Sequence, residues 1–216
     1  MKLSEGVGRL QALLGNADQR QIAEVLQALA ENRNLLGDGV QAHLREHGFT
    51  RGDQAYNAHS FSLFHSAQMS LRMTLWMPAE AAVEQQAFIY GLPHSHDFEL
   101  YAVGYHGNGY RSVKHAIGNA AQLREGVKAA VGAAQSLRLS PGTVLHMRAY
   151  EDMHYVAPPD EFSVSLALMI ADARGGQPGQ RAWSFDQDLQ PIHSGIDAHE
   201  ADTYKRIEAL WQAHRR

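Results

Sequence analysis

One stretch constrains the fold of this chain more than any other, and over residues 91–110 it reads GLPHSHDFELYAVGYHGNGY. Phe, Leu, Tyr and Val dominate it and Gly-Asn-Gly closes it, which is typical of a β-strand that ends in a tight turn. Side chains two residues apart on a strand point to the same face, so His94 and His96 could reach one metal ion together. The stretch therefore predicts a mainly β fold and the beginning of a metal site.

The spacing of these two histidines is not specific by itself. The chain has 13 His among 216 residues, so a His-x-His pair is expected by chance about 0.8 times in such a chain. A third histidine, His154, stands in a later stretch that reads SPGTVLHMRAYEDMHYVAPPDEFSVSLALM. This stretch predicts a strand pair after a Pro-Gly turn, and then a long final strand.

Together, the His-x-His strand, the glycine turn and the distant His before a final strand resemble the metal-binding pattern of the cupin superfamily. The order of these pieces is most similar to the cysteine dioxygenase-like thiol dioxygenases, which hold iron with three His. The stretch PGTVLHMRAYEDMHYV followed by FSVSLALM also resembles the JmjC-type cupins. The resemblance covers about residues 56–170 and implies a double-stranded β-helix, the cupin or jelly-roll barrel, with Fe(II) as its cofactor.

The resemblance also bears on the ligand set. The usual cupin pattern places a Glu four residues after the second His, but Leu100 stands there. Glu99 is one residue earlier, and on a regular strand it would lie on the opposite face unless a bulge intervenes. This departure favours a three-His site of His94, His96 and His154, with Glu99 as a candidate fourth ligand.

His146 competes with His154 for the place of the third ligand, because it follows Pro141 at the spacing at which many cupins place their last His. The JmjC-like pattern favours His154, which stands just before the turn and the SVSL strand. Three neutral imidazoles leave two or three coordination positions open, which suit O₂ and an anionic or chelating substrate. The ligand types are also compatible with Mn, Ni, Zn or Cu.

Three more side chains are candidates for substrate binding. Apolar and other residues alternate along residues 69–77, which puts Arg72 on a face that meets either solvent or the barrel interior. In the interior its guanidinium would hold a substrate carboxylate by paired hydrogen bonds. If the strand before them continues, Arg148 and Tyr150 share a face with His154, as an anion anchor and a hydrogen-bond donor.

The remaining sequence predicts helices on both sides of the strands, within a single cupin domain over residues 1–216. Residues 1–50 form a helical N-terminal segment, residues 56–170 the β-barrel core and residues 197–216 a C-terminal helix. The N-terminal segment contains two helices, since apolar residues recur at helical spacing in two runs. They are Ile22, Val25, Leu26 and Leu29 in the first run, and Leu36, Val40 and Leu44 in the second.

Charge and composition limit the partners. The 19 basic and 23 acidic residues are interspersed and give a net charge of −4, so no electrostatic footprint for nucleic acid or an anionic membrane is visible. The chain has no Cys, which excludes thiolate ligands and cysteine nucleophiles. No stretch has the length of a membrane span or the apolar core of a signal peptide. We therefore expect a cytoplasmic protein with a small-molecule partner. The resemblance to cupins also implies that the chain forms a homodimer.

The resulting hypothesis is a mononuclear non-haem Fe(II) oxygenase or dioxygenase that uses O₂ on a small amino-acid or carboxylate derivative. Cysteine dioxygenases carry a substrate-binding Arg on an early strand, where this chain has His59-Ser60-Phe61, which argues against cysteine as the substrate. A redox-inactive cupin isomerase or lyase is the first alternative. A non-enzymatic ligand-binding barrel is the second, because HSHDFEL also resembles the sensing barrel of AraC-type regulators.

Overall fold

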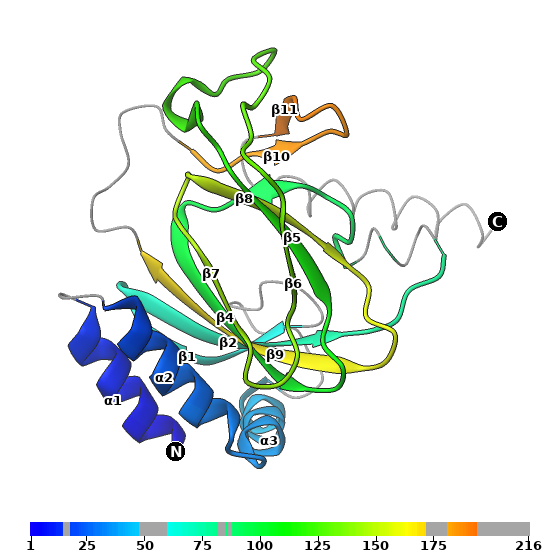
Figure 1. Ribbon diagram of the computed structural model, residues 1–216. Coiled ribbons are helices and arrows are strands. Elements are labelled where there is room, and N and C mark those ends of the chain that lie inside the picture. The colour runs from blue at the N-terminus through cyan, green and yellow to red at the C-terminus, as the bar shows by residue number, and fades with distance from the viewer. Residues whose placement is uncertain (15–17, 48–59, 82–84, 86–87, 172–180, 194–216) are drawn as a thin grey trace.

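A computed structural model describes residues 1–14, 18–47, 60–81, 85, 88–171 and 181–193 (Figure 1). Within these residues, three helices precede the strands: α1 (Leu3–Leu13), α2 (Gln19–Ala30) and α3 (Leu35–His47). The sequence predicted α2 and α3 and missed α1. The predicted C-terminal helix over residues 197–216 lies outside the described residues.

The strands of the described part of the chain form two antiparallel sheets. The first sheet has five strands in the order β1-β2-β9-β4-β7, and the second has six in the order β11-β10-β3-β8-β5-β6. In chain order the strands are β1 (Ser60–His65), β2 (Met69–Trp76), β3 (His94–Ser95), β4 (Phe98–His106), β5 (Arg111–Ala116), β6 (Gln135–Arg138), β7 (Val144–Met147), β8 (Asp152–Ala157), β9 (Ser163–Ala171), β10 (Ser184–Phe185) and β11 (Pro191–His193). The mainly β class predicted from the sequence is confirmed.

The helices cover the outer face of the five-stranded sheet (Figure 1). Helix α2 begins where the Asp18 carboxylate accepts a hydrogen bond from the Arg20 backbone N–H at 2.9 Å, which caps an otherwise unpaired donor. The predicted apolar face of this helix is buried: Ile22, Val25, Leu26 and Leu29. Burial of such a side chain stabilises the fold by about 1.5–3 kcal/mol, so the packing of this face holds the helix on the sheet.

The two faces of β2 have different surroundings. Met69, Leu71 and Met73 are buried against the helices in the outer core. Arg72 and Trp76 alternate with them and face a cavity between the two sheets. The sequence left open whether Arg72 faces solvent or the interior, and in the structure it faces the interior cavity.

The predicted single strand through His94, His96 and Glu99 is wrong. Strand β3 ends at Ser95 and belongs to the six-stranded sheet, whereas β4 begins at Phe98 in the five-stranded sheet. The chain thus passes from one sheet to the other at His96. Because β3 and β4 lie in different sheets, side-chain parity along a continuous strand does not apply to these residues.

Two strands beyond residue 170 complete the six-stranded sheet. Strand β10 pairs with β3, with Ser184 opposite His94. Ser95 reinforces this pairing, because its backbone N–H donates to the Trp183 carbonyl at 2.8 Å and its hydroxyl accepts from the Trp183 N–H at 2.9 Å. Strand β3 is therefore held between β8 and β10.

The Gly-Asn-Gly turn after β4 is confirmed. Gly107 and Gly109 have φ of 76° and 75°, a conformation in which other residues are strained. A Cβ on Gly109 would also lie 2.2 Å from the Leu139 carbonyl oxygen. Within the described residues, no helix is both long and apolar enough to cross a membrane.

Candidate metal centre

Three buried imidazoles converge where the two sheets meet. His94 and His154 lie directly opposite each other on β3 and β8, and His96 follows β3 by one residue. The Nε2 atom of His154 lies 3.1 Å from that of His94 and 3.3 Å from that of His96. Among the described residues, these three form the group of His and carboxylate side chains that could hold a metal ion, with ligand atoms within 4.8 Å of one another.

These distances fit a shared cation. With a metal–nitrogen distance of about 2.0–2.1 Å, two nitrogens on one ion lie about 2.8–3.4 Å apart at bond angles between roughly 90° and 109°. The two measured separations of 3.1 and 3.3 Å fall inside this range. The separations from His154 to each of the other two imidazoles therefore fit a mononuclear metal site.

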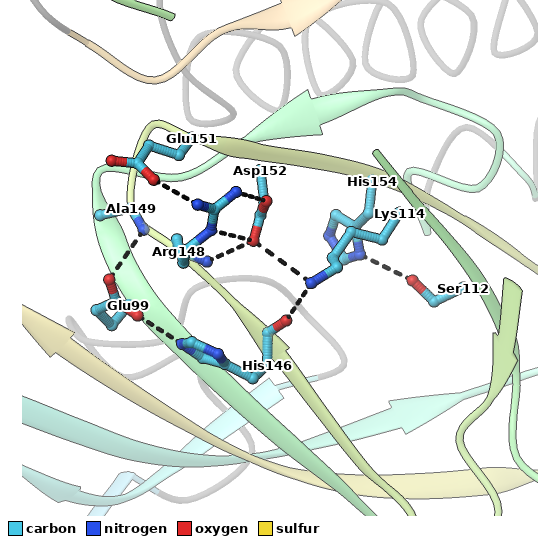
Figure 2. Close-up of polar contacts among 9 residues, drawn as sticks. All are labelled: Glu99, Ser112, Lys114, His146, Arg148, Ala149, Glu151, Asp152 and His154. Carbon is cyan, nitrogen blue, oxygen red and sulfur yellow. Dashed lines mark hydrogen bonds and ion pairs between the residues drawn. The ribbon is translucent and has the colours of Figure 1, made fainter. Parts of the chain in front are cut away.

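Hydrogen bonds at Nδ1 orient two of the three rings. The Nδ1 atom of His94 lies 2.9 Å from the Leu92 carbonyl oxygen. Because a carbonyl only accepts, this nitrogen carries the proton, and Nε2 keeps its lone pair for a metal. The Nδ1 atom of His154 lies 3.0 Å from the buried Ser112 hydroxyl, which can accept its proton in the same way (Figure 2).

The third ring has a different environment. His96 is 7% exposed, and its Nδ1 atom is buried without a hydrogen-bond partner among the described residues. The backbone carbonyl of His96, in contrast, accepts a hydrogen bond of 2.7 Å from the Tyr150 N–H. The main chain of His96 is therefore anchored to the turn before β8, and its ring packs against Phe98 with centroids 4.7 Å apart.

The cluster is electrostatically suited to neutral imidazoles. Burial, and then the neighbouring His94, hold the pKa of His96 well below its usual value of 6.5. Burial also holds the pKa of His154 well below that value, with further contributions from His94, His96 and Lys114. Both rings are neutral at pH 7 and present lone pairs, which is the state that a metal requires.

A cavity of about 100 Å³ lies beside the cluster, between the two sheets. Its wall is mostly apolar and carries Arg72 in addition to the three histidines. From the five-stranded sheet it is lined by Ser60, Arg72, Thr74, Trp76, Phe98, Leu100, Ala102, Ser165, Ala167 and Met169; the other described residues of the wall are Phe88, Ile89, His94, His96, Tyr110, His154 and Val156. Among the described residues, the cavity thus combines a candidate metal site with the cationic side chain of Arg72.

Aromatic side chains close one part of this cavity. The rings of Trp76 and Tyr110 have centroids 4.3 Å apart, and the Trp76 indole N–H donates to the Ser165 hydroxyl at 2.9 Å. Burial raises the pKa of the Tyr110 phenol above its ordinary value, although a hydrogen bond with Ser165 opposes the shift. Tyr110 is therefore a protonated hydroxyl in the cavity wall.

The structure does not bring Glu99 or His146 to the cluster. Along β4, Phe98, Leu100 and Ala102 line the cavity, and Glu99 does not. The Glu99 carboxylate instead lies 2.6 Å from Nε2 of His146 (Figure 2). His146 stacks on Tyr101, which belongs to the outer core beneath the helices. Of the two candidates for the third ligand, His154 is the one that joins His94 and His96.

The strand of His146 also does not continue through Arg148 and Tyr150. Strand β7 ends at Met147, and Tyr150 has a φ of 61° in the turn before β8. Neither side chain lines the cavity. Arg148 binds Glu151 at 2.7 Å and Asp152 at 2.8 Å (Figure 2). Arg148 and Tyr150 therefore do not continue the strand of His146, and their side chains do not face the cavity, contrary to the expectation from the sequence.

Sequence reasoning missed the polar groups behind the cluster. Asp152 is 1% exposed, and its carboxylate accepts hydrogen bonds from Arg148 and from Lys114, the latter at 3.4 Å. Burial alone would raise the pKa of Asp152, but these partners outweigh it and hold the pKa below its usual value. The spacing Asp152-x-His154 was an available signal, since both residues share a face of β8.

Comparison with known proteins gives limited information. No protein-family model matches the chain. No curated protein matches it either.

Similar solved structures include cupins and DMSP lyases. DMSP lyase DddQ from Ruegeria pomeroyi DSS-3 is 13% identical with a TM-score of 0.39, over 80% of this chain and 93% of that one. A cupin domain from Bordetella pertussis Tohama I is 12% identical with a TM-score of 0.32, over 55% and 98%. A chain from the DMSP lyases RdDddP and RnDddQII is 16% identical with a TM-score of 0.33, and the match spans 55% of this chain but only 49% of that one. Similarity at this level defines neither a family nor an activity for this chain.

Proposed function

We propose that this chain is a cupin-type oxygenase in which His94, His96 and His154 bind one Fe(II) ion. The observation that carries the proposal is the convergence of three buried Nε2 atoms, 3.1 and 3.3 Å apart along its two measured edges, beside a cavity. Fe(II) bound there would supply the activation of O₂ for oxidation of a small substrate.

The side chains around the cluster support an anionic substrate. Three neutral imidazoles leave the full positive charge of the ion uncompensated, which favours a negatively charged ligand. Arg72 adds a second positive charge in the cavity wall, and a guanidinium can bind a carboxylate through two hydrogen bonds. We therefore propose a carboxylate or amino-acid derivative as the substrate, with Arg72 orienting its carboxylate.

The size of the cavity limits that substrate. Its volume of about 100 Å³ is smaller than the roughly 150 Å³ of an apolar cavity that takes up benzene. Only a fragment of a few non-hydrogen atoms fits inside. Its wall is mostly apolar, with Trp76 and Tyr110 among the lining side chains, and suits the apolar part of such a fragment.

Metal content tests the ligand assignment. We expect near-stoichiometric iron in protein purified without chelators or reconstituted anaerobically with Fe(II), and its loss in the single variants His94→Ala, His96→Ala and His154→Ala. His146→Ala is the matched control and should keep its iron, because His146 is bound to Glu99 on the other side of the five-stranded sheet. Absence of bound metal in the reconstituted wild type would refute the enzyme proposal.

A redox-inactive isomerase or lyase is the second candidate. It is favoured by the same donor set, which also suits Zn, Ni or Mn, and by the protonated Tyr110 hydroxyl in the cavity wall, which can donate a proton to a leaving group. Oxygen distinguishes the two. A panel of small carboxylates should be consumed together with O₂ by an oxygenase, whereas a lyase or isomerase should turn over equally well in anaerobic buffer.

A further inference from the structure

The three candidate ligands are not held in the same way. His94 and His154 each have a ring Nδ1 hydrogen bond, to Leu92 and Ser112. The buried Nδ1 of His96 has no such partner among the described residues. A metal ligand whose ring lacks this support must be oriented by other contacts.

The turn between β7 and β8 supplies such a contact. The Tyr150 N–H donates to the His96 carbonyl at 2.7 Å, at the point where the chain crosses between the sheets. Tyr150 has a φ of 61°, which a residue with a side chain adopts only where its surroundings enforce it. The position of His96 therefore depends on what fixes this turn.

The Asp152 carboxylate holds the Arg148 end of the turn, and the Glu99 carboxylate accepts a hydrogen bond from the Ala149 N–H at 3.4 Å (Figure 2). One oxygen of Asp152 accepts from the Arg148 backbone N–H at 2.9 Å, and the other from the Arg148 guanidinium at 2.8 Å. Lys114 connects the same carboxylate to β7, because its ammonium donates to Asp152 at 3.4 Å and to the His146 carbonyl at 3.0 Å. These charged hydrogen bonds are largely shielded from water at the carboxylate, since the Asp152 side chain is 2% exposed.

We propose that Asp152 is a positioning residue for the metal centre, and that it holds His96 in place through the Arg148–Tyr150 turn. The inference rests on the proposed three-His metal site. It gives Arg148 and Tyr150 a role behind the cluster in place of contact with the substrate. The position of His96 then depends on an ion-pair network, whereas His94 and His154 are oriented by hydrogen bonds at their own Nδ1 atoms.

The test is the affinity of the full chain for Co²⁺ alone, measured by competition with a chromophoric chelator. We expect Asp152→Asn to raise the Kd of Co²⁺ by 10-fold or more, in the range found for groups that orient metal ligands. Asp160→Asn is the matched control. The same acid-to-amide change there breaks only the exposed ion pair with Arg138, and its Kd should remain within two-fold of the wild type.

The number of histidines bound to Co²⁺ separates a positioning role from general destabilisation. X-ray absorption should give three imidazoles in the wild type and two in Asp152→Asn, in samples whose far-UV circular dichroism matches the wild type. A wild-type Kd for Asp152→Asn, or weaker binding with all three imidazoles retained, would overturn the inference.

Arg148→Gln provides a milder variant in case Asp152→Asn does not fold. The Arg148 side chain is 44% exposed, and the backbone N–H of the variant can still bind Asp152. We expect its Kd for Co²⁺ to rise several-fold, and an unchanged Kd would contradict the role of the turn. If the wild type binds no Co²⁺, the proposed function fails; if the wild type binds and the variants bind equally well, only this inference fails.

Discussion

At the scale of single residues, the second nitrogen of each imidazole decides how well the first one is presented to a metal. A proton held at Nδ1 leaves Nε2 as the lone-pair donor and fixes the plane of the ring. His94 receives this support from a backbone carbonyl, which no side-chain substitution removes. His154 receives it from the Ser112 hydroxyl, so its orientation depends on one replaceable side chain.

Ser112→Ala should therefore weaken metal binding. Ser112 is completely buried, and without its hydroxyl the Nδ1–H of His154 loses its acceptor. We expect the Kd of Co²⁺ to increase about 10–100-fold, measured by chelator competition at pH 7.5. Ser136→Ala, on the exposed strand β6 next to β5, should bind Co²⁺ like the wild type. Equal affinity in Ser112→Ala would show that the hydroxyl does not orient His154.

At the scale of elements, local periodicity correctly predicted which face of a single strand or helix is buried in the core. The alternation in β2 separated the outer core from the face of Arg72, and the apolar spacing in α2 identified its buried side. The path through His96 could not be predicted in this way, because the change of sheet depends on β8 and β10, which are distant in sequence. Parity also misplaced Arg148 and Tyr150, because their turn depends on hydrogen bonds from Arg148 to Asp152 and from Tyr150 to His96, and the second of these joins segments distant in sequence.

The helical layer leads to a stability prediction. Leu29 on α2 is completely buried and lies close to Gly6 of α1, where an added Cβ would meet its side chain at 2.5 Å. Leu29→Ala should lower the free energy of unfolding by about 2–5 kcal/mol, measured by urea denaturation. Leu44→Ala on α3 is the control, since Leu44 is 38% exposed, and a change there should be within about 0.5 kcal/mol. A similar loss for both variants would contradict the close packing of α1 against α2.

At the scale of the whole molecule, the candidate metal centre lies between two sheets that exclude water from it. That arrangement keeps His96 and His154 neutral, because their pKa values are held well below 6.5 by burial first and by neighbouring charges second. In the unfolded chain the same residues titrate near 6.5. Folding is therefore coupled to the release of protons from these two histidines.

The metal-free protein should consequently lose stability as the pH falls below about 6.5. Between this value and the lower folded pKa values, the unfolded state binds protons that the folded state does not, so the free energy of unfolding decreases by at most about 1.4 kcal/mol per pH unit for each histidine. Urea unfolding with a chelator at pH 7.5, 6.5 and 5.5 measures this slope. The slope should be smaller in His96→Gln, and constant stability over this range would contradict neutral, buried imidazoles.

The position of β3 in the sequence has a consequence for folding during translation. Its two neighbours in the sheet, β8 and β10, are both encoded after it, and β10 comes about ninety residues later. At roughly 5–20 residues per second, the ribosome produces β3 about 5–20 s before β10. The pair His94 and His96 thus emerges before the third imidazole and before either neighbouring strand. In the proposed three-His site, all three ligands are present only after the nascent chain has passed residue 154, and β3 has both of its neighbouring strands only after residue 185.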